Sequence, residues 1–268
     1  MNKNNCVILV SSCDVFDDLW HPFFALFFRY WPDCPFPIYL ISNYKKYNDP
    51  RVKTVSVGED KGWATNMKTA LKQIPTPYVL AMFEDFFLEQ CVDTKHINSL
   101  LEYASESKAA YIRLFPSPSP DKFFSNTLNL GEISKNASYR ASLQASIWDK
   151  DVFSEIIKDG ETAWDVEMKG TIRSYQIKQP FLSVKEPALY YNPRTAVIRG
   201  KWNYDVVRFC KRDGIKINTQ KRPIYYTGAI SALVDVIRKS FFGRKIRTIP
   251  VLGFLGVIIM RKLRKLLD

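Results

Sequence analysis

The first eighty or so residues alternate between short strand-like runs and longer runs with helical spacing, and this order restricts the fold more than any other feature. The strand candidates are residues 6–12, 37–42, 52–57 and 78–83, and apolar helical stripes cover residues 20–31 and 63–74. This order is typical of an α/β layer architecture. The sequence therefore predicts a mixed, mainly parallel sheet flanked by helices.

The second half of the chain continues this alternation less regularly. Thr94 can cap a helix, residues 111–114 read as a short strand, and residues 116–120 form a proline-rich loop. Further on, we expect a strand over residues 139–148, a helix over 150–158 and a helix over 203–212.

Two adjacent carboxylates end the fourth strand candidate. The apolar run that begins at Tyr78 stops at Glu84 and Asp85, and large apolar residues resume at Phe86. Burying a charge without a partner is costly, so such acids face a metal, a cationic ligand or a solvent-filled cleft. A capped strand-to-helix corner is the alternative structural role.

Polar residues also end the first strand candidate, at Ser11, Ser12 and Asp14. Because ligands of open α/β sheets bind at the carboxyl ends of strands, these residues and the acid pair can face one crevice. Asn66 lies off the apolar stripe of the 63–74 helix and is a further candidate for donor binding.

Two later segments carry charges suited to catalysis. Asp165 and Glu167 flank one apolar residue, and on a helix they diverge by about 200 degrees, so that one of them faces a given cleft. Arg199 and Lys201 enclose Gly200, which lets the backbone approach an anion closely.

These charged residues are suited to the transfer of a group from an anionic donor. Asp85 and Glu84 would hold a divalent cation, Mn²⁺ or Mg²⁺, against a diphosphate. Asp165 or Glu167 would deprotonate an acceptor hydroxyl, while Arg199 and Lys201 stabilise the departing phosphate.

The sequence lacks the motifs of several other enzyme classes. The chain has no Walker loop and no GxGxxG, GxSxG or HExxH motif, and it has only two histidines. Its five cysteines include no CxxC pair, which argues against a zinc site or a disulfide framework.

The net charge of +12 is concentrated near the C-terminus, which argues against nucleic acid as the partner. Residues 238–268 hold nine basic residues and one acid, Asp268. They flank an apolar run at residues 249–260, which is shorter than the roughly 20 residues of a transmembrane helix. The pattern favours a helix on an anionic membrane surface, with packing on the chain's own domain as the alternative.

We therefore expect a catalytic domain over residues 1–236 and a membrane-associating tail over residues 237–268. No secretory signal precedes the first strand, so the expected location is the cytoplasm, peripheral on the inner face of the cytoplasmic membrane.

The chain resembles GT-A-type glycosyltransferases of bacterial lipopolysaccharide and capsule biosynthesis over roughly residues 5–215. The resemblance rests on the first strand ending at Ser11-Ser12-Cys13-Asp14, on the segment YVLAMFEDFFL in the place of the Asp-x-Asp metal motif, and on the acidic segment Trp164-Asp165-Val166-Glu167. It implies a GT-A-like fold, a nucleotide-sugar donor and a hydroxyl acceptor on a glycan.

Carried over by position, the resemblance assigns roles to individual residues. Asp85 matches the metal-binding acid, and Glu84 occupies the variable acidic position. Asp14 and Ser11 would lie near the base and ribose, and Asp165 or Glu167 matches the catalytic base of inverting members. The segment departs from the family pattern, because it lacks the two aspartates around a spacer.

The resulting hypothesis is an inverting glycosyltransferase that transfers a hexose to a lipid-linked glycan acceptor. One alternative is a nucleotidyl or sugar-phosphate transferase of the same fold, although no glycine-rich phosphate loop precedes Gly58. The other is a non-enzymatic basic adaptor that binds a membrane or nucleic acid.

Overall fold

The computed structural model describes residues 5–123 and 128–225 of the chain. The N-terminal elements are β1 (Cys6–Ser11), the 3-10 helix η1 (Asp14–Phe16), α1 (Asp17–Tyr30), β2 (Ile38–Ser42), β3 (Val52–Ser56), α2 (Trp63–Leu71) and β4 (Tyr78–Phe83). This series confirms the predicted order of strands and helices.

The remaining elements are shorter on average. They are α3 (Thr94–Ser107), β5 (Tyr111–Arg113), β6 (Lys122–Phe123), β7 (Leu130–Glu132), β8 (Ser146–Asp149), α4 (Lys150–Ile156), α5 (Ala163–Asp165), the π-helix η2 (Val166–Gly170), α6 (Thr171–Ser174), β9 (Phe181–Val184), β10 (Val197–Ile198), β11 (Lys201–Asn203), α7 (Tyr204–Arg212) and β12 (Ile224–Tyr225).

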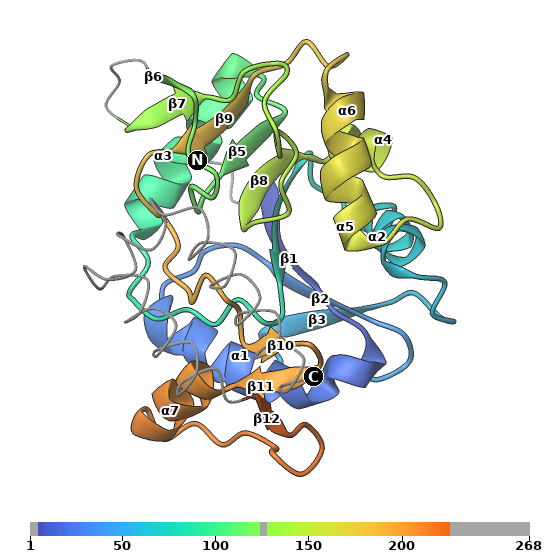
Figure 1. Ribbon diagram of the computed structural model, residues 1–268, viewed down its shortest axis with the longest axis vertical. Helices are drawn as coiled ribbons and strands as arrows, with labels where there is room; N and C mark the ends of the chain where they lie inside the picture. Colours follow the sequence, from blue (N-terminus) through green and yellow to red (C-terminus); the bar gives the residue numbers. More distant parts are fainter. Residues whose placement is uncertain (1–4, 124–127, 226–268) are drawn as a thin grey trace, which may run out of the picture.

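The larger of the two sheets among the described residues has nine strands in the order β3-β2-β1-β4-β8-β5-β9-β7-β6. The four N-terminal strands pair in parallel, and β8 then runs antiparallel to both β4 and β5. The predicted mixed α/β sheet is thus confirmed, with the antiparallel strands all in its second half. A smaller sheet, β10-β11-β12, lies beside α1 and α7 (Figure 1).

The core lies on both faces of the large sheet, as the alternation along β1 shows. Cys6, Ile8 and Val10 pack into one cluster with side chains of α1, α3 and α7. Val7 and Leu9 pack into a second cluster with side chains of α2 and α4. Burial on both faces explains why β1 is a continuous apolar run.

Two local predictions were wrong. Of the strand predicted over residues 139–148, only β8 is extended, because the segment before it bonds to the side chains of Thr171 and Glu167 instead of to a neighbouring strand. Asp93, rather than Thr94, caps α3 by accepting hydrogen bonds from the backbone N–H groups of Lys95 and His96.

Within residues 5–123 and 128–225, no helix is long and apolar enough to cross a membrane. The basic tail predicted over residues 237–268 lies outside the described residues.

Candidate functional site

The site begins where β1 and β4 end side by side. Their register pairs Ser11 with Phe83, and the backbone N–H of Glu84 donates to the Ser11 carbonyl at 3.3 Å. The Ser11 hydroxyl in turn accepts a 2.9 Å hydrogen bond from the indole Nε1 of Trp63, at the start of α2. The predicted meeting of these strand ends is therefore observed.

Both acids of the pair are held in a poorly solvated environment. Glu84 is 6% exposed, and its burial raises the pKa of its carboxyl well above the usual value, with the nearby charge of Asp85 adding to the effect. Burial also raises the pKa of Asp85 to about 6, against the opposing effects of a Thr195 hydrogen bond and the charge of Arg222. Such shifts are typical of functional carboxylates.

Arg222 supplies the positive charge beside the acid pair. Its Nε and Nη2 atoms donate to the two carboxylate oxygens of Asp18 at 3.0 and 3.1 Å, and its Nη1 donates to the Gly200 carbonyl at 2.9 Å. The side chains of Arg222 and Asp18 are 8% and 1% exposed. This buried bidentate ion pair fixes the guanidinium near Glu84 and Asp85.

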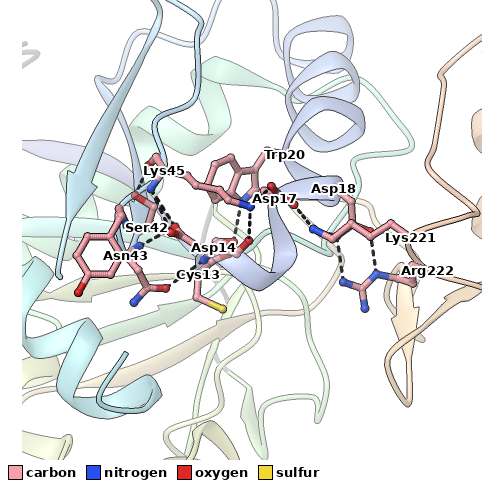
Figure 2. A network of polar contacts seen from close by, with 12 residues as sticks. Cys13, Asp14, Asp17, Asp18, Trp20, Ser42, Asn43, Lys45, Lys221 and Arg222 are labelled. Atoms are coloured by element: carbon pink, nitrogen blue, oxygen red, sulfur yellow. Dashed lines mark hydrogen bonds and ion pairs between the residues drawn. The ribbon is translucent and has the colours of Figure 1, made fainter. Parts of the chain in front are cut away.

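Asp14 organises the neighbouring loop. Its carboxylate accepts hydrogen bonds from the backbone N–H groups of Asn43, Tyr44 and Lys45, at 2.9 to 3.2 Å. Figure 2 shows that these contacts join η1, which follows β1, to the loop after β2. The Ser12 hydroxyl accepts from Trp20 Nε1 at 2.8 Å. The Asp14 carboxylate and the Ser12 hydroxyl are therefore both bound by groups of the protein itself.

A second ion-pair group continues from this loop. Asp17 pairs with both Lys45 and Lys221, and these two bonds lower the pKa of its carboxyl against the opposing effect of burial. The cluster thus links the loop after β2, the first turn of α1 and the segment before β12 (Figure 2).

Asn66 holds the turn before α2. Its Nδ2 donates to Asp60 Oδ1 at 2.7 Å, and its Oδ1 accepts from the backbone N–H of Lys61 at 3.2 Å. Asn66 is 7% exposed, so its amide positions the segment that carries Trp63.

Arg199 and Gly200 form the turn between β10 and β11. Both have positive φ angles, 50° and 73°, as a two-residue hairpin turn of the primed types requires. Gly200 serves this turn, and its carbonyl is bound by Arg222. Lys201 is exposed at the start of β11. Among the described residues, the charge of Arg222 lowers the pKa of both Glu84 and Asp85.

Asp165 has strong partners of its own. It forms a capping box with Thr162 and a 2.8 Å ion pair with Lys169. These hydrogen bonds hold the pKa of the Asp165 carboxyl far below the usual value, and the bond from Lys169 contributes most. A carboxylate stabilised in this way is a weak general base.

Glu167 points the other way, as the predicted divergence requires. Its Oε1 accepts hydrogen bonds from the Leu143 backbone N–H at 2.7 Å and from the Ser142 hydroxyl at 3.1 Å. No hydrogen bond to its Oε2 is found within the described residues, and the side chain is half-buried.

Aromatic rings connect Glu167 with the end of β4. Gln144, next to the segment bound by Glu167, accepts from the Tyr191 hydroxyl at 2.7 Å. The Tyr191 ring stacks on Phe86 with centroids 4.5 Å apart. Leu143 and Gln144 also share a cavity of about 10 Å³ with Ser11. These contacts link the segment that Glu167 binds to the end of β4.

The acid pair offers few ligands to a metal. In the part of the chain that the structure describes, no group of three or more His, Cys, Asp and Glu side chains could hold an ion. Magnesium bound with substrate phosphates needs only one or two carboxylates, which Asp85 and Glu84 can provide. Asp85 is the better placed of the two, because it is half-buried whereas Glu84 is buried.

The sequence reasoning missed Asp18 and Arg222. Adjacent acids at the start of a helix and a Lys-Arg pair are both common on solvated surfaces. The two residues are 204 positions apart in the sequence, and local spacing gives no sign that they meet.

A scan of protein-family models found no match, and neither did a search of curated protein sequences. Among solved structures, TarS 1–349 of S. aureus matches with a TM-score of 0.49 and 12% identity, over 70% of this chain and 60% of that chain. Its complex with UDP-GlcNAc matches with a TM-score of 0.47 and 13% identity, over 70% and 58%. The bifunctional IspDF of Campylobacter jejuni gives 0.33 and 15%, over 60% and 46%. This chain spans less than two thirds of the length of each.

Proposed function

We propose that the protein is a glycosyltransferase that moves a sugar from a nucleotide-sugar donor to a hydroxyl group of a glycan. The observation that carries the proposal is the pair of buried Glu84 and half-buried Asp85 at the carboxyl end of β4, with the charge of Arg222 acting on both. At such an edge, the carboxylates can bind the diphosphate of a nucleotide sugar through a divalent cation, and a fixed guanidinium can bind it directly.

In the proposed reaction, the acceptor oxygen forms a bond to the anomeric carbon as the bond from that carbon to the diphosphate breaks. The bonding electrons leave with the nucleoside diphosphate, and the acceptor proton goes to Glu167 Oε2. A divalent cation at Asp85, when bound, would supply positive charge against the diphosphate. Arg222, which Asp18 holds in place, would add a fixed guanidinium near the diphosphate. A single displacement of this kind inverts the anomeric centre.

We further propose that the sugar is a hexose and that the acceptor is lipid-linked. The support for a lipid-linked acceptor is the basic and apolar sequence of residues 238–268, which suits an anionic membrane surface. Such a tail would keep the enzyme peripheral on the cytoplasmic membrane, near its acceptor.

Thermal unfolding with nucleoside diphosphates and their sugars, with and without Mn²⁺, tests donor binding. UDP and UDP-GlcNAc belong in this screen. A ligand at a hundred times its Kd stabilises the folded state by about 2.7 kcal/mol, which raises Tm by several degrees. The Mn²⁺-dependent part should vanish in Asp85→Asn.

Asp151→Asn is the matched control, because Asp151 is exposed in the first turn of α4, at the opposite edge of the sheet. It should keep the whole Tm shift. If no nucleoside diphosphate or nucleotide sugar raises Tm, the proposed function is wrong.

A further inference from the structure

A polar pocket lies at the opposite edge of the sheet from the acid pair. It is an open cavity of about 500 Å³ where β9 begins. The first residues of β5 and β9, Tyr111 and Phe181, are paired there, and β4 begins at Tyr78 on the same side. Glu84 follows the other end of β4, so the pocket is separate from the candidate donor site.

Positive charge predominates in this pocket. Its lining includes Lys135, Arg140 and Lys178, with Glu132 as the single acid. Glu132 also pairs with Lys122 at 3.5 Å. Neither Lys135 nor Lys178 has an ion pair within the described residues, and both are exposed. An anion entering the pocket would therefore meet two uncompensated ammonium groups.

Arg140 is part of the pocket lining and is 5% exposed. Its Nη1 donates to the Ser174 carbonyl at 2.5 Å, and its guanidinium lies 3.8 Å from the centroid of the Phe181 ring. Its buried Nε has no hydrogen-bond partner. An almost fully buried guanidinium without a paired carboxylate is costly unless an anion compensates it.

Uncharged groups complete the lining. Tyr103 and Ser107 come from the last turns of α3, and Ile177, Pro180 and Leu182 provide apolar surface. Phosphate groups are bound well by a guanidinium with ammonium groups around it. The apolar wall suits an organic group attached to the phosphate.

We propose that this pocket binds a phosphate monoester through Arg140, Lys135 and Lys178. The site is independent of the proposed glycosyl transfer, because it shares no residue with the donor crevice. The free phosphate ion and an organic phosphate present the same charged group, but only the organic phosphate has an apolar part that can contact the apolar wall.

Isothermal titration of the full chain with inorganic phosphate and with phenyl phosphate tests the proposal. Both probes should bind, and a tighter Kd for phenyl phosphate would identify an organic phosphate as the ligand class. The double variant Lys135→Gln/Lys178→Gln should weaken binding by about tenfold or more, since each lysine contributes a charge-assisted contact. Both lysines are exposed, so the fold should be unaffected.

The matched control is Lys72→Gln/Lys95→Gln, which removes the same charge from exposed positions away from the pocket. It should bind both probes as the unmodified chain does. Failure of both probes to bind would overturn the proposal, as would equal binding by the two double variants.

Discussion

The chain carries two acid pairs, Glu84 with Asp85 and Asp165 with Glu167, and the fold gives Asp85 and Asp165 opposite properties. The first pair ends a core strand, and burial raises the pKa of both carboxyls. Asp165 lies on a helix surface, where Lys169 and Thr162 lower its pKa. The chemistry of a carboxylate thus depends on the groups around it. Partners on the same helix, such as Lys169 and Thr162, keep Asp165 ionised and hydrogen-bonded.

The largest expected effect is at the buried pair. Asp85→Asn removes the charge that would bind a cation while keeping the size of the side chain. We expect kcat/KM for glycosyl transfer to fall by about a thousandfold, in the range for loss of a major electrostatic group. Circular dichroism should show an unchanged fold. Activity within a few-fold of the unmodified enzyme would remove the distinction between the two pairs.

The next effect separates the two acids of the second pair. Glu167→Gln should lower kcat by about a hundredfold, because a neutral amide cannot accept the acceptor proton. Asp165→Asn is its natural control, since Asp165 already binds Lys169 and Thr162. It should leave kcat within about threefold and lower Tm slightly through the weakened cap. The reverse ranking of the two variants would identify Asp165 as the base.

Much of the fold could be predicted because it depends on local periodicity. The strands and helices from Cys6 to Phe83 follow apolar patterns that each segment carries by itself. Residues 139–145 could not be predicted, since Ser142 and Leu143 bond to a side chain 24 or 25 residues away. Tertiary contacts there override the strand-like pattern.

The candidate site shows the same limit. Glu84 and Asp85 were recognisable, because charge interrupts an apolar run. Arg222, whose charge acts on both acids, comes from a distant segment and pairs with Asp18. The segment Arg199-Gly200-Lys201, which suggested an anion site, contains a hairpin turn at Arg199 and Gly200. The residue types indicated where the acidic site lies, and only the fold could show that Arg222 lies near it.

The pH dependence offers a smaller and more gradual test of the buried pair. Since the pKa of Asp85 is raised from 3.8 to about 6, activity that needs its ionised form should fall about tenfold per pH unit below pH 6. The folded state also holds this proton more tightly than the unfolded chain. The protonated Asp85 carboxyl therefore stabilises the folded state below about pH 4, and this stabilisation is lost as the pH rises through 6.

A pH–rate profile and the Tm at each pH measure these two trends. In Asp85→Asn, the limb near pH 6 should disappear from both curves. A limb that persists in this variant would assign the titration to another group.

The smallest effect concerns the exposed surface beside Asp165. Trp164, Met168 and Ile172 follow one another at helical spacing and are 78%, 58% and 62% exposed. An exposed indole can stack on a sugar ring of the acceptor. Trp164→Ala should therefore raise KM for the acceptor by about three- to tenfold while kcat stays the same.

Because Trp164 is mostly exposed, its replacement should change the free energy of unfolding by no more than about 0.5 kcal/mol. Trp164→Phe, which keeps an aromatic ring, should restore most of the acceptor affinity. Steady-state kinetics at saturating donor separate KM from kcat. If Trp164→Ala lowers kcat instead of raising KM, the ring acts on the base at Glu167 and not on the acceptor, and the exposed surface of α5 belongs to the catalytic machinery.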